Sequence, residues 1–278
     1  MRILFAALFA VCSSVSASAD GEGTTSLTKL MTAYDARGWE GVGRLNIGFG
    51  GMCTGAMIAP NVVLTAAHCL YNSRSGAKIN PATIQFEAGL RNGRPSASRK
   101  VRRAVIHPDY VFTGTEADDV SVSHDLAILE LESAIRLAHI QPFETGKRPR
   151  KGASVGVVSY AHDRAESPSI QEVCHVLARR QGALILSCDV DFGSSGAPVF
   201  AEVDGQPRIV SVVSAKGEVR GRRVSLGTNL EKPLSEMMAL LQSGGGVAAK
   251  STPEVRIMKP NAPRLLNGGG AGAKFLRP

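Results

Sequence analysis

The chain has 278 residues, of which 44% are apolar and 20% are charged. This is the composition of a globular protein, so wholesale disorder and a fibrous repeat are excluded. The formal net charge of +8 could indicate a polyanionic partner. However, residues 243–278 hold six basic residues against Glu254 alone. Basic and aromatic side chains are not interleaved anywhere, so we expect no nucleic acid partner.

The N-terminus has the pattern of a secretory signal peptide. Arg2 is followed by a short apolar run over 3–11 and then by the small residues Ala17-Ser18-Ala19. We expect a signal peptide over 1–19 and export to the periplasm or the extracellular space. Cys12 would permit lipoprotein processing, but Val11 before it is not the small residue that such sites carry. No later stretch is apolar and long enough for a membrane span.

Residues 20–41 are expected to form an N-terminal extension or a prosegment, and a globular domain is expected over 42–242. Between about 42 and 232 the chain consists of short, β-branched, apolar stretches, mostly separated by Gly, Pro, Asn or Asp. This pattern predicts an all-β fold, either a sandwich or barrels. The polar stretch 147–152 divides the domain into halves over about 42–146 and 152–232. The predicted strands are 52–58, 62–65, 84–88, 101–106, 127–131, 154–159, 173–178, 184–186, 197–200 and 209–213.

Apolar spacing predicts a helix near the end of the domain. The helix covers about 233–242 and stops at a glycine run, because its apolar residues recur at i, i+3, i+4 and i+7. The same spacing over 27–34 permits a short N-terminal helix. Residues 243–278 contain two glycine triplets, four prolines and no periodic apolar face, so we expect a disordered basic tail.

Four cysteines remain after removal of the signal peptide: Cys53, Cys69, Cys174 and Cys188. An even number of cysteines in an exported protein indicates disulfides, with three possible connectivities. No C-x-x-C pair is present, so we expect no zinc site. Pairing of sequence neighbours would close two short loops and stabilise the fold by about 3 kcal/mol each.

Three segments supply the residue types that acyl transfer requires. His68 follows Thr65-Ala66-Ala67, Asp125 precedes an apolar run, and Ser195 lies in Gly193-Ser194-Ser195-Gly196. Each segment alone is commonplace. Together they offer a nucleophile, a base and an acid that orients the base. The glycines allow a tight turn in which the backbone N–H groups of Gly193 and Ser195 would bind an oxyanion.

These motifs resemble those of the chymotrypsin/trypsin-like serine proteases, and more closely their bacterial secreted, glutamyl-endopeptidase-like branch. The resemblance covers about 42–242 and rests on Thr65-Ala66-Ala67-His68-Cys69 and Gly193-x-Ser195-Gly196-x-Pro198. It implies two antiparallel six-stranded β-barrels followed by a C-terminal helix. It also implies that His68 and Asp125 lie on the first barrel and Ser195 on the second.

The resemblance further implies a secreted serine endopeptidase that acts on peptides through a Ser–His–Asp triad and an acyl-enzyme, without a cofactor or a metal. A catalytically silent binding protein on the same fold is the alternative. The resemblance also favours the disulfides Cys53–Cys69 and Cys174–Cys188.

Three residues are implied in substrate binding: Asp189, Ser214 and Lys216. An Asp six positions before the nucleophile would favour Lys or Arg side chains, whereas Lys216 could pair with Asp189 and cancel its charge. Small or apolar specificity ranks second and acidic specificity last. Ser194 departs from the animal digestive relatives, which have an Asp there to bind a newly cut N-terminus, so activation of that kind is not expected.

Overall fold

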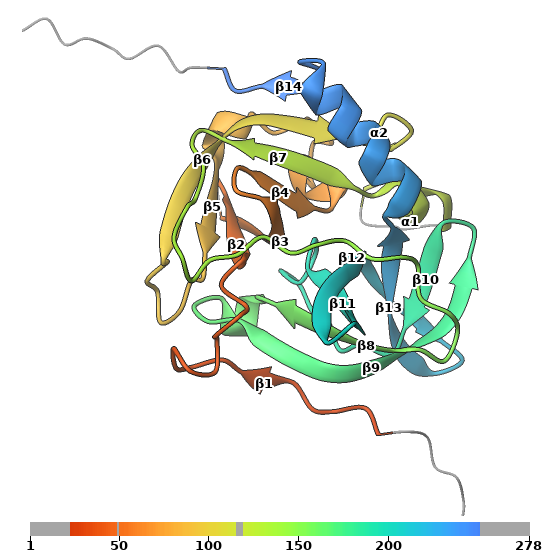
Figure 1. Ribbon diagram of the computed structural model, residues 1–278. Helices are drawn as coiled ribbons and strands as arrows, with labels where there is room; N and C mark the ends of the chain where they lie inside the picture. Colours follow the sequence, from red (N-terminus) through yellow and green to blue (C-terminus); the bar gives the residue numbers. More distant parts are fainter. Residues whose placement is uncertain (1–22, 49, 115–118, 251–278) are drawn as a thin grey trace, which may run out of the picture.

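The computed structural model describes residues 23–48, 50–114 and 119–250, and its strands form two closed antiparallel barrels of six strands each (Figure 1). The expected all-β fold is therefore confirmed. In the first barrel the strands follow the order β6-β5-β2-β3-β4-β7, and β6 pairs with β7 to close it. Its strands are β2 (Val42–Ile47), β3 (Gly51–Ala59), β4 (Val62–Thr65), β5 (Ile84–Ala88), β6 (Ala97–Ile106) and β7 (Ala127–Leu131).

The second barrel follows the order β9-β10-β13-β12-β11-β8, and β8 pairs with β9 to close it. Its strands are β8 (Ser154–Ser159), β9 (Ser169–Arg180), β10 (Ala183–Leu186), β11 (Pro198–Val203), β12 (Gln206–Val219) and β13 (Arg222–Asn229). The strand patterns in the sequence missed β2 and β13. Both strands contain polar and glycine residues that weaken the apolar pattern.

Alternating side chains fill the barrels, as β5 illustrates. Ile84, Phe86 and Ala88 are fully buried, whereas the two residues between them are only half-buried. The Phe86 ring needs Gly43 on the neighbouring strand, because a Cβ there would lie 2.5 Å from Phe86 Cε2. Packing of this density leaves little freedom to shift one strand against another.

An aromatic cluster ties the two barrels together. Trp39 precedes the first barrel, Phe143 lies on the connection between the barrels, and Phe200 lies on β11. The ring centroids of Trp39 and Phe200 are 5.0 Å apart, and those of Phe143 and Phe200 are 4.8 Å apart. These edge-on contacts stabilise the approach of the two barrels beyond simple burial.

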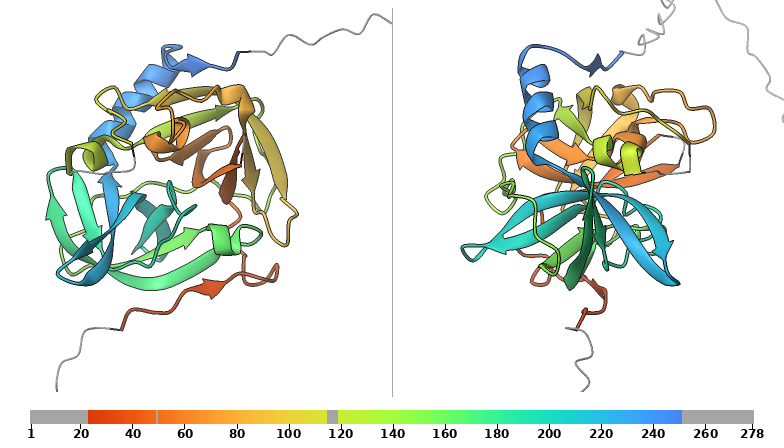
Figure 2. Two further views of the ribbon diagram at one scale, coloured as in Figure 1. Left: turned by 180° about the vertical axis from the view of Figure 1, so that it is seen from behind. Right: turned by 90° about the vertical axis from the view of Figure 1, so that its right-hand side faces the viewer.

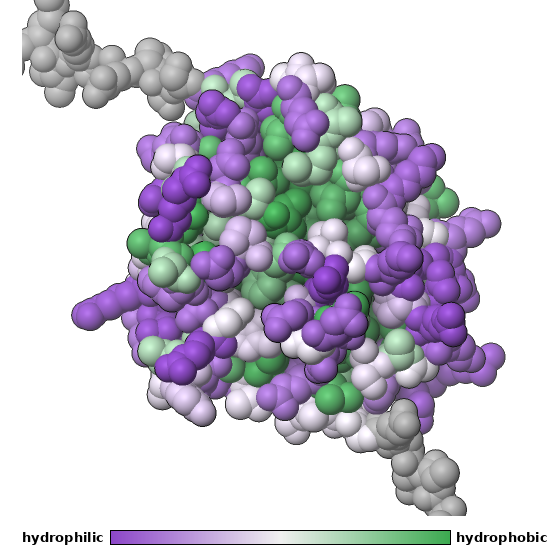
Figure 3. Space-filling model, viewed as in Figure 1, coloured by the Kyte–Doolittle hydropathy of each residue, from purple (hydrophilic) through white to green (hydrophobic). Residues whose placement is uncertain are grey.

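The expected C-terminal helix is confirmed as α2 (Glu231–Gln242). It follows the last strand of the second barrel but packs against β6 and β7 of the first, with Met237 fully buried (Figure 2). Apolar side chains gather beside this helix (Figure 3). They leave a hollow of about 680 Å³ lined by Ile58, Phe143, Leu234 and Met238 among others. A second helix, α1 (Asp119–His124), was not expected.

The helix permitted over 27–34 is not formed. Residues Thr28–Lys29 form β1, which pairs with β9 of the second barrel. Of the four apolar residues that suggested the helix, Leu30 is buried, whereas Met31 and Tyr34 are 48% and 78% exposed. The spacing therefore did not mark one buried face.

The folded chain continues beyond α2. Val247–Ala248 form β14, which pairs with Ala104 and Arg103 of β6, so residues 243–250 pack on the first barrel and not in a free tail. The rest of the expected tail, 251–278, and the expected signal peptide, 1–19, lie outside the described residues. None of the described helices is long and apolar enough to cross a membrane.

Two disulfides link Cys53 to Cys69 and Cys174 to Cys188, as expected. The first joins β3 to the turn after β4. The second joins β9 to the segment that leads to Ser195. Both bridges stand next to the motifs from which the sequence predicted chemistry, so each restrains the backbone close to a candidate site residue.

Removal of the second bridge should lower the free energy of unfolding by about 3 kcal/mol, because Cys174 and Cys188 are 14 positions apart. The double variant Cys174→Ala/Cys188→Ala tests this in urea, with the fluorescence of Trp39, the single tryptophan, as the signal. An unchanged unfolding midpoint at equal slope would contradict the expectation. Cleavage of the parent protein without reduction should yield a Cys174–Cys188 peptide.

Candidate active site

His68 lies in a short turn whose position is restrained on both sides. The turn is a 3-10 helix, η1 (Ala67–Leu70), that begins two residues after β4 ends. Ala66 and Ala67 are fully buried, which leaves no room for larger side chains. Cys69 is bonded to Cys53 on β3, so the imidazole projects from a backbone that is held to two strands.

The carboxylate of Asp125 holds His68 in place. Asp125 Oδ1 accepts a hydrogen bond of 2.8 Å from the backbone N–H of His68, and Oδ2 lies 2.6 Å from His68 Nδ1. The hydroxyl of Ser214 donates to the same Oδ2 at 2.5 Å. An ionised carboxylate only accepts hydrogen bonds, so the proton of a neutral His68 lies on Nδ1. His68 Nε2 is then free to accept a proton.

The same carboxylate affects the pKa of His68. Burial by itself lowers the pKa, but the charge of Asp125 and its hydrogen bond to the ring outweigh burial. The net result is a pKa above 6.5. His68 is therefore a stronger base than a free imidazole, and its charged form is stabilised by a buried carboxylate that is only 4% exposed.

The turn that carries Ser195 packs directly against the strand end that leads to His68. A Cβ on Gly196 would lie 2.1 Å from Thr65 Oγ1 and 2.3 Å from the Thr54 carbonyl oxygen, so only glycine fits. Gly196 also has φ +79°. The backbone N–H of Thr54 donates to the Ser195 carbonyl at 2.8 Å, and its hydroxyl donates to the Gly193 carbonyl at 2.9 Å. Thr54 of the first barrel thus clamps the turn of the second.

Two backbone N–H groups at this turn are available to a ligand. Gly193 has φ +98°, and the carbonyl before it, that of Phe192, accepts a 2.9 Å hydrogen bond from the backbone N–H of His162. Because C=O and N–H point in opposite directions across a trans peptide, the Gly193 N–H points away from His162. Within the described part of the chain, neither this N–H nor that of Ser195 donates to a protein acceptor.

Ser194 lies beneath this turn in a buried polar cluster. Its hydroxyl accepts from the Arg164 guanidinium at 3.3 Å and from the Asp191 N–H at 3.3 Å, and it lies 3.2 Å from the Tyr160 carbonyl oxygen. Arg164 also donates to Ser159 Oγ and pairs with Asp163. Ser194, at the position where animal digestive relatives have an Asp, is therefore hydrogen-bonded to groups of the second half of the chain.

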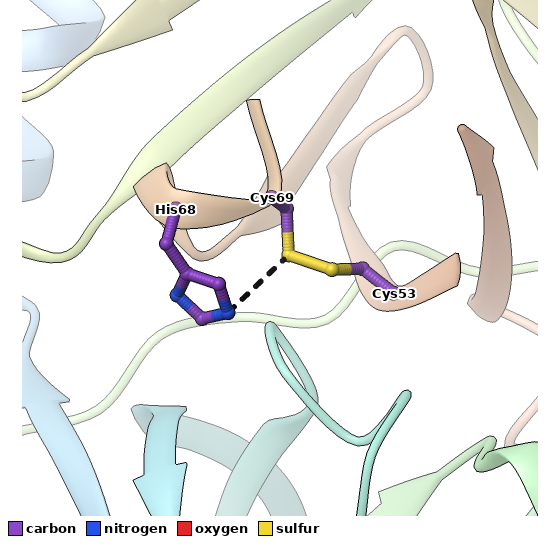
Figure 4. Close-up of side chains that lie close together, drawn as sticks. All are labelled: Cys53, His68 and Cys69. Atoms are coloured by element: carbon purple, nitrogen blue, oxygen red, sulfur yellow. Dashed lines mark hydrogen bonds between the residues drawn. A yellow bond between two sulfur atoms is a disulfide. The ribbon is translucent and has the colours of Figure 1, made fainter. Parts of the chain in front are cut away.

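Among the described residues, the Ser195 hydroxyl makes no hydrogen bond. His68 Nε2 instead lies 4.0 Å from Cys69 Sγ (Figure 4). Hydrogen bonds between catalytic groups are commonly long before substrate binds. The geometry is therefore compatible with a hydrogen bond between Ser195 and His68 that forms when substrate binds. The cluster of Cys53, His68 and Cys69 does not fit a metal, because both sulfurs belong to the disulfide and no thiolate remains.

The three residues implied in substrate binding lie in different surroundings. Ser214 is buried with its hydroxyl on Asp125. Asp189 is exposed, and its backbone N–H donates to Gln171 Oε1 at 2.7 Å. Lys216 is exposed, and its ammonium lies 2.7 Å from Asp191 Oδ1 and 3.8 Å from the centroid of the Phe192 ring. The hydrogen bond from Lys216 and that from the Phe192 N–H hold the pKa of Asp191 below its usual value. Lys216 therefore pairs with Asp191, not with Asp189 as the sequence suggested.

Residues 32–231 match the family described as Trypsin. The chain belongs to the trypsin family. A glutamyl endopeptidase of Bacillus licheniformis is 26% identical over 189 residues, which cover 66% of this chain and 57% of that protein. Human serine protease 23 is 25% identical over 170 residues, covering 54% of this chain and 43% of its own. The chain thus spans about half the length of these curated relatives.

The fold agrees with this membership. A solved structure of a Glu endopeptidase in complex with MPD superimposes with a TM-score of 0.64, at 20% sequence identity, over 80% of this chain and 98% of that one. The trypsin-like arrangement of two barrels is therefore shared over nearly the whole of that protein.

Sequence reasoning missed Thr54 and Arg164, which support the turn that carries Ser195 in this trypsin-family chain. Thr54 reads as an ordinary strand residue, and Arg164 lies in a polar stretch that resembles solvated loop. The side chain of Arg164 is in fact only 7% exposed. No local pattern signals either role, because Gly193 lies 139 positions from Thr54 and Ser194 lies 30 positions from Arg164.

His68 should titrate above pH 6.5 in NMR spectra of its imidazole protons. Asp125→Asn should bring that pKa below 6.5, because it removes the raising charge and leaves the lowering effect of burial. The exposed His162 serves as the internal control. A His68 pKa that is the same with and without the Asp125 charge would show that the carboxylate does not govern this ring.

Proposed function

We propose that this trypsin-family protein is an exported serine endopeptidase in which Ser195 is the nucleophile, His68 the general base and Asp125 the group that orients it. The observation that carries the proposal is the pair of hydrogen bonds by which Asp125 holds the backbone and ring of His68. The packing of Gly196 against Thr65, next to that ring, supports it. Because one buried carboxylate binds both the backbone N–H and the ring Nδ1 of His68, the orientation of the imidazole is fixed.

The residues imply a two-step reaction. His68 Nε2 removes the proton of the Ser195 hydroxyl as Oγ attacks the substrate carbonyl carbon, and the N–H groups of Gly193 and Ser195 bind the oxyanion. Protonated His68 then gives its proton to the leaving amine as the peptide C–N bond breaks, leaving an acyl-enzyme. Water, deprotonated by His68, then attacks the ester carbonyl carbon. The bond from that carbon to Ser195 Oγ breaks, His68 returns the proton to Oγ, and the acid is released.

Export is part of the proposal. The signal-peptide pattern over 1–19 and the two disulfides both fit an oxidising compartment outside the cytosol. The two bridges restrain the backbone next to His68 and next to Asp189.

For specificity we propose that Asp189 selects Lys or Arg side chains. Asp189 lies six residues before Ser195 on the segment held by Cys188, and no ion pair to its carboxylate occurs in the described residues. Because Lys216 is already paired with Asp191, it does not cancel the charge of Asp189. The name of the Bacillus licheniformis relative and the cation at Lys216 support acidic specificity as the competing outcome.

Ser195→Ala should abolish peptide hydrolysis and labelling by a fluorophosphonate, while the unfolding midpoint stays near that of the parent. The change removes one oxygen atom that has no hydrogen bond among the described residues, so the fold loses little. Ser73→Ala, on the exposed surface, is the matched control and should keep full activity. A well-folded parent protein that neither labels nor hydrolyses peptides would instead favour the catalytically silent binding protein.

A peptide library should show cleavage after Lys or Arg, and Asp189→Ser should reduce that preference by about fivefold in kcat/KM, because the substrate cation would lose an exposed charged partner. Lys216→Gln should leave the basic preference in place. Cleavage after Glu that is lost in Lys216→Gln, or a basic preference that survives in Asp189→Ser, would refute the assignment of Asp189.

A further inference from the structure

Strand β9 has one side that its barrel neighbours cover only in part. On one side, β8 pairs with residues between Ser169 and His175. On the other side, β10 reaches only from Val176 to Arg180. The stretch from Ser169 to Val173 would therefore expose unpaired backbone N–H and C=O groups on that side, which is costly for a strand edge.

The segment before the first barrel covers this open side. Thr28 and Lys29 of β1 pair with Ile170 and Ser169. Thr25 extends the contact, because its N–H donates to the Val173 carbonyl at 2.9 Å and its hydroxyl accepts from the Val173 N–H at 2.9 Å. Figure 2 shows this segment lying along β9 on the outside of the second barrel.

A buried glutamine connects this segment to the chain that leads to the nucleophile. Gln171 lies on β9 and is 2% exposed. Its Nε2 donates to the Thr25 carbonyl at 2.8 Å, and its Oε1 accepts from the Asp189 N–H at 2.7 Å. The two partners fix the orientation of the amide, since a carbonyl can only accept and an N–H can only donate.

Asp189 is thereby held next to a second anchor. Cys188, its neighbour, is bonded to Cys174, three residues along β9 from Gln171. The chain from 188 to 195 therefore begins at two residues, Cys188 and Asp189, that are both attached to β9. The N-terminal segment pairs with the same strand. A shift of Thr25 would remove the partner of Gln171 and release one of the two anchors.

We propose that residues 25–30 are a permanent strand of the working protein, with Gln171 as a positioning residue that sets the backbone of Asp189 for substrate binding. This rests on the proposed function and favours an N-terminal extension over a prosegment for this part of the chain. Maturation then leaves Thr25 in place, so the N-terminus of the exported protein lies at or before that residue.

Gln171→Leu, which keeps a similar volume and removes both hydrogen bonds, should raise KM for the preferred peptide about tenfold. The rate of fluorophosphonate labelling should stay within about twofold, because the reagent needs Ser195 and His68 but not the substrate side-chain pocket. Glu172→Gln, an exposed neighbour on the same strand, is the control and should match the parent in both measurements. An unchanged KM, or labelling that falls as far as kcat/KM, would overturn the proposal.

A second experiment does not depend on how Gln171→Leu folds. A chain whose signal peptide is joined to Met31, lacking 20–30, should fold with a raised KM, and a synthetic peptide of residues 23–31 should restore the parent value where a scrambled peptide does not. Parent-like KM in the truncated chain, or failure of the peptide to restore it, would overturn the proposal. Absence of fluorophosphonate labelling in the parent protein would contradict the proposed protease function instead.

Discussion

The close approach of Gly196 to Thr65 is the constraint on which the rest of the site depends. The absence of a side chain at Gly196 lets the turn that carries Ser195 in the second barrel touch the end of β4 in the first. His68 lies three residues after Thr65, so this contact places the turn that carries Ser195 beside the segment that carries the imidazole. Any Cβ there would clash with Thr65 and with the Thr54 carbonyl and push the two barrels apart.

Other interactions hold the barrels at that separation. Thr54 binds two carbonyls of the turn from the first barrel, and Ser214 of the second barrel binds the carboxylate of Asp125. The aromatic cluster of Trp39, Phe143 and Phe200 closes the interface on another part of the molecule. Helix α2 adds a further tie, because it leaves the second barrel and packs on the first. The site is thus distributed over both barrels, and so are the restraints on it.

Buried groups support the turn that carries Ser195. Ser194 contacts Arg164 and the Tyr160 carbonyl, and the chain before it is anchored on β9 by Cys174 and Gln171. A guanidinium that is almost fully buried needs hydrogen-bond partners, and the hydroxyls of Ser159 and Ser194 supply them. The turn therefore has partners in the second barrel as well as in the first, and the N-terminal segment supplies the neighbour that β9 otherwise lacks.

Local patterns in the sequence determined the strands 62–65, 84–88, 127–131 and 154–159, the C-terminal helix and the residue types for acyl transfer, because alternation, apolar spacing and short motifs are properties of neighbouring residues. The tertiary structure alone decided that Thr28–Lys29 form a strand in place of a helix, that Lys216 pairs with Asp191, and that Thr54, Arg164 and Gln171 support the site. Each of these depends on partners far away in the chain. The free energy of a strand edge, a buried cation or a buried amide is set by what the fold places beside it, and no local pattern records that.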